Sequence, residues 1–299
     1  MRRDLRGRMR RAVALVALVG AACWGTEALA QDATKGPNTG RLSLSGGVDW
    51  TTDYYFRGIV QETRDYIVQP YGDLTFKLWD GVPAFGNLAF TMGTWNSLHG
   101  GPTGADGPNA EPKAWYETDL FLKLGWTVFE NLSTSITYTA YISPNNFFST
   151  VQEIALGLGY DDSKLLGPFS LRPSLLLAFE LEGQADAGRD EGIYLQLGVT
   201  PGYTFNAGGT YPVTLSFPLL VGLSLDDYYE FGTGRDKTFG YVQGGVGVAV
   251  PLAFIPPDFG SWLLKAGVNV LHLGGNVRDV NKDRDATEII GTVGIAFTY

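Results

Sequence analysis

Hydrophobic and polar residues alternate with a period of two through most of the chain after residue 41, and this feature restricts the fold more than any other. In residues 213–225, Val213, Phe217 and Leu225 share one face, while Thr214 and Ser216 share the other. Residues 132–143 repeat the pattern. Successive side chains of a β-strand point to opposite faces, so the pattern predicts strands rather than helices.

The alternation divides the chain into twelve expected strands separated by turn-forming residues. An even number of strands is typical of an antiparallel sheet that closes on itself. The expected strands are residues 41–57, 66–79, 87–97, 113–127, 132–143, 151–160, 169–182, 193–205, 213–226, 238–250, 261–273 and 287–299.

The connections alternate in character along the chain. One set of connections comprises residues 81–86, 129–131, 161–168, 206–212 and 251–260. The other set is more polar and includes the longest loop; it comprises residues 59–65, 98–112, 144–150, 183–192, 227–237 and 274–286. In outer-membrane barrels the short turns face the periplasm and the long loops face outside. We therefore expect both chain ends on the periplasmic side.

The first thirty residues indicate export. Six arginines between Arg2 and Arg11 precede a short apolar run that ends at Trp24, and residues 28–30 read Ala-Leu-Ala. This is typical of a cleaved signal peptide. We expect residues 1–30 to be removed, residues 31–40 to form a short periplasmic segment, and residues 41–299 to form the barrel. Lipidation at Cys23 is the alternative, but Gly20 stands where a lipobox has leucine.

The expected mature chain is acidic and has no thiol. The sequence has 22 Lys and Arg against 31 Asp and Glu, and residues 1–30 hold six arginines, two acids and the single cysteine, which leaves 16 against 29. A net charge of −13 argues against nucleic acid as a partner. Beyond residue 30 no apolar stretch reaches the roughly 20 residues of a membrane-spanning helix. Membrane insertion would therefore require strands.

Closure of the sheet follows from the membrane environment. Backbone amide and carbonyl groups find no water in hydrocarbon, so each strand edge must pair with another strand. The alternation continues to Tyr299, which predicts recognition of the last strand by the outer-membrane assembly machinery, and lipid and lipopolysaccharide as partners. A secreted jelly roll or sandwich is the soluble alternative. Aromatic residues expected near strand ends, at the depth of the lipid headgroups, are Trp50, Tyr54, Trp79, Trp95, Trp115, Tyr116 and Trp262.

Charged residues share the phase opposite to the apolar face, and charges are costly at mid-depth on a lipid-facing surface. They are therefore expected to line the lumen. The candidates are Asp49, Asp53, Arg57, Asp73, Lys77, Glu117, Asp119, Lys123, Glu153, Arg172, Glu180, Glu182, Lys265 and Glu288. Such charges either form a salt-bridged plug or line a water-filled pore in which the acidic excess favours cations.

Residues 52–61 read Thr-Asp-Tyr-Tyr-Phe-Arg-Gly-Ile-Val-Gln. This segment resembles the S-D-Y-x-F-R-G-I-x-Q signature of the Gcw_chp (TorF-like) family of bacterial barrels, with Thr52 in place of serine. The resemblance implies an outer-membrane barrel and brings no substrate or catalytic residue. From the residues alone, Asp49, Asp53 and Arg57 lie four apart on one strand, which predicts a ladder of alternating charge on its inward face.

Signals for catalysis and metal binding are weak. The two histidines are His99, expected in the second loop, and His272, expected to face outward at the rim; neither has an evident nucleophile in its local sequence. We therefore expect no enzyme activity and no cofactor. One weak metal candidate lies in the last loop, where alternating oxygen ligands resemble half of a calcium loop without its glycine and final glutamate. Its residues are Asp279, Asn281, Asp283 and Asp285.

The sequence thus predicts an all-β, closed, antiparallel transmembrane barrel of about twelve strands in the bacterial outer membrane. The favoured function is a narrow, porin-like channel with an acidic lumen that prefers cations or other small solutes. The alternatives are a plugged structural barrel, and an enzyme or adhesin that acts through its loops. Phe147-Phe148 and Tyr228-Tyr229 are the aromatic loop pairs that favour an adhesin.

Overall fold

The computed structural model of the chain describes residues 40–82, 84–101, 114–209, 211–231, 235–281 and 285–299. The expected signal peptide, most of the expected periplasmic segment and Asp283 lie outside the described residues. Of the elements, β1 is Leu42–Thr51, β2 Tyr54–Phe56, β3 Ile59–Glu62, β4 Ile67–Val82, β5 Phe85–His99, β6 Trp115–Val128, β7 Leu132–Ile142 and β8 Val151–Tyr160. They continue as α1 Ser163–Leu166, η3 Gly167–Phe169, β9 Ser174–Glu182, β10 Ile193–Val199, β11 Gly202–Phe205, β12 Val213–Ser216, β13 Leu219–Asp226, β14 Phe239–Pro251, η4 Pro257–Phe259, β15 Ser261–Leu273, α2 Gly275–Val280 and β16 Thr287–Thr298.

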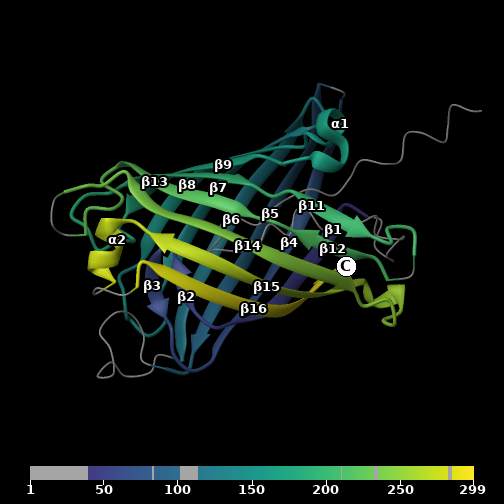
Figure 1. Cartoon of the computed structure of the whole chain (residues 1–299). Coiled ribbons are helices and arrows are strands. Elements are labelled where there is room, and N and C mark those ends of the chain that lie inside the picture. Colours follow the sequence, from purple (N-terminus) through teal and green to yellow (C-terminus); the bar gives the residue numbers. More distant parts are fainter. Residues whose placement is uncertain (1–39, 83, 102–113, 210, 232–234, 282–284) are drawn as a thin grey trace, which may run out of the picture.

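One antiparallel sheet closes into a barrel (Figure 1). Its order runs β1, β4, β5, β6, β7, β8, β9, β10, β13, β14, β15 and β16, and β16 pairs back with β1. The segments β11 and β12 pair with each other, and β12 also pairs with β14. In the chain, β11 directly follows β10, and β13 directly follows β12. The segments β10 and β11 therefore form one interrupted barrel strand, and β12 and β13 form another. The described residues therefore form a barrel of twelve strands, which confirms the expected fold and strand number.

Proline causes both interruptions. Pro201 lies between β10 and β11, and Pro218 lies between β12 and β13. Proline has no backbone N–H to donate to a sheet ladder. The chain instead bridges the gap with other hydrogen bonds, from Phe217 N to Pro201 O (2.8 Å) and from Gly245 N to Pro218 O (3.0 Å).

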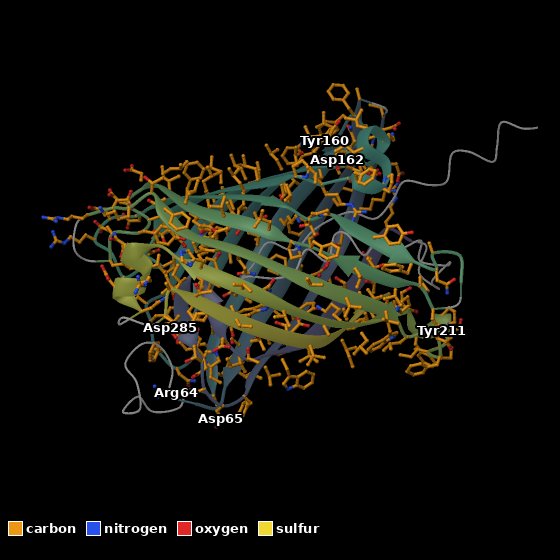
Figure 2. All side chains as sticks on the ribbon, viewed as in Figure 1. Arg64, Asp65, Tyr160, Asp162, Tyr211 and Asp285 are labelled. Carbon is orange, nitrogen blue, oxygen red and sulfur yellow. The ribbon has the colours of Figure 1, made fainter. Side chains whose placement is uncertain are left out.

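The barrel has two distinct ends. Figure 1 shows the C-terminus and α1 at one end and α2, β2 and β3 at the other. At the first end, which we call the turn end, the strands are joined by the connections 83–84, 129–131, 161–173, 206–212 and 252–260. The other end, which we call the loop end, carries the connections 52–66, 100–114, 143–150, 183–192, 227–238 and 274–286. Figure 2 labels Asp162 and Tyr211 near the turn end and Arg64, Asp65 and Asp285 near the loop end.

The outer face of the barrel is apolar, as the alternation requires. The exposed side chains that project from it include Leu74, Phe76, Met92, Leu120, Leu122, Leu124, Leu156, Leu158, Leu197, Val246, Val268 and Val293. Their neighbours along each strand point inward, where Asp49, Asp119 and Lys123 are buried. Among the described residues no helix is long and apolar enough to cross a membrane.

The first expected strand differs from the structure in one important way. The barrel strand β1 ends at Thr51, and residues 54–62 form a separate two-stranded hairpin, β2–β3. All ten residues of β1 pair with residues of β4, and β4 begins only at Ile67. The intervening residues therefore form an inserted segment between two neighbouring barrel strands.

Aromatic residues near strand ends divide into two groups. Trp50, Trp79 and Trp115 are exposed on the outer face, as expected for rings at the headgroup depth. Tyr54, Trp95 and Tyr116 are at most 3% exposed and pack together in one core cluster. The expectation that these three rings form part of an outer girdle is therefore wrong, because they face the hairpin.

Candidate functional site

The hairpin turns through two residues in the left-handed region. Phe56 pairs with Ile59, and the intervening Arg57 and Gly58 have φ of 49° and 87°. Two-residue hairpin turns with both φ positive match the twist of β-strands. Gly58 suits this conformation without strain, while a non-glycine residue such as Arg57 adopts it at some cost. The strained position carries the side chain that crosses the lumen.

Two buried clusters surround the hairpin. One contains Tyr54 and Phe56 of β2, together with wall residues Ile67, Trp95, Tyr116, Tyr141 and Val151. The other contains Tyr55 and Val60, together with Ala155, Ala178, Tyr194, Tyr228, Tyr229, Tyr241, Leu271, Leu273, Val277 and Ile290. Both faces of the hairpin are therefore covered by residues from the barrel strands and loops. The hairpin fills the loop end of the lumen.

Residues from the last two loops form hydrogen bonds with the backbone at the tip of the hairpin. Asn281, just after α2, donates from Nδ2 to Gly58 O (2.9 Å) and accepts at Oδ1 from Val60 N (3.0 Å). The Tyr229 hydroxyl donates to Arg57 O (2.9 Å). Gly240 provides the space for this ring, because a Cβ there would collide with Tyr229. The last two loops thus hold the hairpin in place.

A buried ion pair joins the hairpin to the far wall. Arg57 donates through both terminal nitrogens to Glu153 on β8, at 2.6 and 2.9 Å, and Nη1 also donates to the Tyr228 hydroxyl at 2.8 Å. Burial alone would lower the pKa of Arg57, but the charge of Glu153 and the hydroxyl of Tyr228 outweigh it and hold that pKa well above its usual value. Arg57 is therefore charged in place. A bidentate pair of this kind fixes both distance and orientation.

Acidic groups also face the side of the hairpin that carries Tyr54 and Phe56. The hydroxyl of Tyr54 donates to Glu117 Oε2 (2.8 Å), and Asp119 lies two residues further along the same inward face of β6. Both carboxyl groups are buried. Two neighbouring buried carboxyl groups, with Glu153 opposite, therefore gather around the hairpin at the closed end.

A second ion pair lies further along the lumen. Lys265 on β15 is 3.0 Å from Asp49 Oδ1 on β1, and its Nζ donates to the Tyr71 hydroxyl at 3.0 Å. Ser45 donates to Asp73 Oδ2 on the neighbouring strands. Several inward-facing residues from here to the turn end, including Ser45, Asp73 and Thr75, are partly exposed. Solvent therefore enters the barrel from the turn end.

The structure distributes the expected lumen residues unevenly. Asp49, Asp73, Glu117, Asp119, Lys123, Glu153, Glu180, Lys265 and Glu288 occupy inward positions on barrel strands, and Lys77 occupies one near the turn end, 2.7 Å from Asp80. The expected ladder of Asp49, Asp53 and Arg57 is wrong. Asp53 lies between β1 and β2, and Arg57 pairs across the lumen.

Two other expected lumen residues lie elsewhere. Arg172 precedes β9, with φ of 50°, because the expected strand 169–182 begins only at Ser174. Glu182 is exposed and accepts a hydrogen bond from Gln152. A register shift in the β8–β9 pairing places it opposite Gln152 rather than the inward Glu153. A bulge of this kind moves a side chain to the other face.

His99 lies in a different place from the expected one. It is the last residue of β5, is fully buried, and its Nε2 is 2.7 Å from Ser97 Oγ on the same inward face. Its ring stacks on Tyr116, and its Nδ1 is 4.0 Å from Glu62 Oε2 of the hairpin. The contact between Ser97 and His99 could have been found from the sequence, because residues two apart on one strand point to the same face. His272 is exposed and contacts Thr287, as expected for the rim.

The weak metal candidate in the last loop is not assembled by the residues described. Asp279 and Asp285 are exposed, while Asn281 is fully buried and bound to the hairpin backbone. No group of three or more His, Cys, Asp or Glu side chains suited to a metal occurs in the described part of the chain. The aromatic pairs Phe147-Phe148 and Tyr228-Tyr229 also pack inward, against Tyr116 and Tyr194 respectively.

Solved structures similar to this chain are barrels. LpxR from Salmonella typhimurium matches over 85% of this chain and 99% of its own, with 10% identity and a TM-score of 0.47. The NanC porin matches over 86% and 98%, with 10% identity and a TM-score of 0.35. The β-domain of the Bordetella autotransporter BrkA matches over 87% and 99%, with 12% identity and a TM-score of 0.37. No family model and no curated protein matches the sequence.

Proposed function

We propose that this chain is an outer-membrane channel for small cations, and that its first loop holds it closed. The observation that carries the proposal is the hairpin of residues 54–62, which fills the loop end of a polar lumen and is pinned by the ion pair of Arg57 with Glu153. A static plug needs no polar lumen beneath it. The partly exposed Ser45, Asp73 and Thr75 lead from the turn end toward the hairpin.

The charge of the lumen supports cations as the transported class. The inward acids outnumber the inward bases among the described strand residues. The acids are Asp49, Asp73, Glu117, Asp119, Glu153, Glu180 and Glu288, and the bases are Lys77, Lys123 and Lys265. Acidic side chains along a pore lower the electrostatic barrier for positive ions. With the hairpin displaced, Glu153 would lose its partner and add to this field.

The resemblance to the Gcw_chp family gains a physical meaning under this proposal. The residues that carry it, 52–61, are nearly those of the hairpin, and Arg57-Gly58 is its turn. We propose that the chain belongs to this family and that the signature encodes the closure. The outer membrane is the proposed location, because the exterior is apolar and its strands pair around the whole barrel.

The direct test replaces residues 54–62 with nine Gly and Ser residues and measures conductance in a planar bilayer. A matched control replaces the nine residues 252–260 at the turn end. We expect the unaltered protein and the control to be silent, and the hairpin variant to give steady steps with a reversal potential that favours cations in a salt gradient. A folded hairpin variant that stays silent would contradict the channel and support a structural barrel.

One contact favours a second candidate, a serine hydrolase. Ser97 Oγ and His99 Nε2 are 2.7 Å apart, as a nucleophile and its base would be. However, both residues and Glu62 are at most 1% exposed, so no substrate reaches Ser97 while the hairpin is in place. Labelling of the variant without the hairpin by a fluorophosphonate probe separates the two proposals. Equal labelling of that variant with and without Ser97→Ala supports the channel, and labelling lost with Ser97→Ala supports the hydrolase.

A further inference from the structure

The guanidinium group of Arg57 occupies an aromatic cage. Its Cζ lies 4.1 Å from the centre of the Tyr194 ring, 5.3 Å from that of Tyr228 and 5.0 Å from that of Phe56. Glu153 accepts hydrogen bonds from both terminal nitrogens of Arg57, and the Tyr141 hydroxyl donates to the same carboxylate at 3.3 Å. The cage therefore combines a carboxylate with ring faces, the two groups that bind a planar organic cation.

Most of this cage does not belong to the hairpin. Glu153 is on β8, Tyr194 on β10, Tyr141 on β7 and Tyr228 in the loop 227–238, and only Phe56 shares the hairpin with Arg57. The wall residues are held independently. Tyr194 shares a hydrogen bond with Tyr241 (2.9 Å), and Tyr228 N donates to Ser224 Oγ (3.0 Å). The cage can therefore persist without the side chain that fills it.

We propose that this cage is a binding site for small guanidinium-bearing cations, and that Arg57 is its built-in occupant in the closed barrel. The inference deepens the proposed channel function, on which it rests, by naming the class of cation that the lumen selects. A guanidinium fits better than an ammonium ion, since its planar fork meets both oxygens of Glu153 while its face lies on Tyr194.

A free cation competes with Arg57 at a disadvantage. Arg57 is tethered, and its backbone is fixed by Tyr229 and, through Gly58, by Asn281. Tethering gives a group a high effective concentration at its site. The unaltered protein should therefore bind free guanidinium compounds poorly, and removal of the Arg57 side chain should expose the intrinsic affinity of the cage.

The test uses Arg57→Asn in the full-length, refolded barrel. Asparagine followed by Gly58 is a preferred sequence for this turn, so the substitution removes the guanidinium and keeps the hairpin geometry. Titration calorimetry with methylguanidinium measures binding, methylammonium serves as the competitor of different shape, and Arg57→Asn/Glu153→Gln removes the carboxylate. Retained heat-modifiable migration on gels shows that each variant is folded.

We expect Arg57→Asn to bind methylguanidinium about tenfold or more tightly than methylammonium. The double variant and the unaltered protein should both bind methylguanidinium much more weakly than Arg57→Asn. Equal binding by Arg57→Asn and the double variant, or no binding by either, would overturn the cage. The measurement involves no ion flow, so its outcome is separate from that of the channel. A barrel that binds but never conducts would overturn the channel alone.

Discussion

The two ends of the lumen share one barrel wall but differ in what fills them. Toward the loop end, inward-facing side chains such as Tyr194, Tyr241 and Trp95 are large and at most 5% exposed, and they pack against an inserted hairpin. Toward the turn end, inward positions are held by small residues such as Ser43, Ser45 and Ala296, which stay partly exposed. The same strands therefore build a packed core at one end and a wet lumen at the other.

The difference shows that closure is a property of side-chain size and of one insertion, rather than of barrel diameter. Large rings alone would leave gaps between opposite walls, and the hairpin supplies the atoms that fill them. Interiors packed in this way respond strongly to small changes in volume or charge. Substitutions matched between the two ends should therefore have unequal effects.

The largest contrast is expected between two ion pairs. Glu153→Ala leaves Arg57 charged and buried, and breaking such a pair costs about 3–5 kcal/mol. Asp80→Ala breaks the pairs that Asp80, which is 60% exposed, forms with Arg41 and Lys77 at the turn end, and it should cause little change because surface pairs contribute little. The free energy of unfolding from urea titration in detergent micelles measures both.

A double variant provides the control for this contrast. Arg57→Asn/Glu153→Ala removes the charge that Glu153→Ala leaves behind, and it should recover much of the lost stability. Similar losses for Glu153→Ala and Asp80→Ala would show that the hairpin pair is solvated, and the distinction between the two ends would fail.

A volume change should give the next largest contrast. Ala178 on β9 faces the filled end and is 1% exposed, while Ala296 on β16 faces the lumen near the turn end and is partly exposed. Ala178→Leu forces extra atoms into a packed core and should cost about 1–3 kcal/mol. Ala296→Leu has solvent beside it and should cost much less. The same urea titration checks both, and equal costs would mean that the turn end is packed as well.

The turn of the hairpin offers a smaller effect that is specific to the loop end. Gly58→Ala places a Cβ at φ of 87° and within 3.3–3.4 Å of Tyr241, Val277 and Leu273. We expect a loss of about 1 kcal/mol or more, concentrated in faster amide exchange of residues 54–62. The matched substitution Gly208→Ala, with nothing within 4 Å of its Cβ, should leave exchange unchanged. Unchanged exchange in Gly58→Ala would mean that the tip is not confined.

The barrel could be predicted from sequence because lipid on one side and a polar lumen on the other impose alternation on every strand. The hairpin could not, because Asp53 and Arg57 share the phase of β1 and extend its apparent pattern to residue 57. One signal was present. Tyr54, Tyr55 and Phe56 are apolar in succession, which suits a segment buried on both faces rather than a barrel strand.

The site was predictable in part for the same reason. Inward phase follows from parity, which placed Asp49, Asp119 and Lys265 on the lumen side of their strands. Partners are set by which strands meet across the barrel, and no local pattern gives that. Arg57 meets Glu153 across 96 residues of sequence, and Asp49 meets Lys265 across 216. The bulge that displaces Glu182 also has no local signature.

The smallest effect is expected at the turn end, where Asp162 organises the connection before β9. Its carboxylate accepts hydrogen bonds from Leu171 N and Arg172 N, each at 3.0 Å, and from the Ser170 hydroxyl. Burial alone would raise the pKa of Asp162, but these hydrogen bonds, that of Ser170 first, outweigh it and hold the pKa below the ordinary value of 3.8. The ionised form is therefore favoured by the folded turn.

A lowered pKa adds stability that is fully present above pH 3.8 and is lost as the pH falls through the folded value. Asp162→Asn should therefore be less stable than the unaltered protein at pH 7, by about 1 kcal/mol or less, and the gap should close by pH 2–3. Because other carboxyl groups titrate over the same range, the measured quantity is the difference between the two proteins at each pH. A gap that persists at low pH would show that shape rather than charge holds this turn, whereas proton uptake by the loop end would shift both proteins alike.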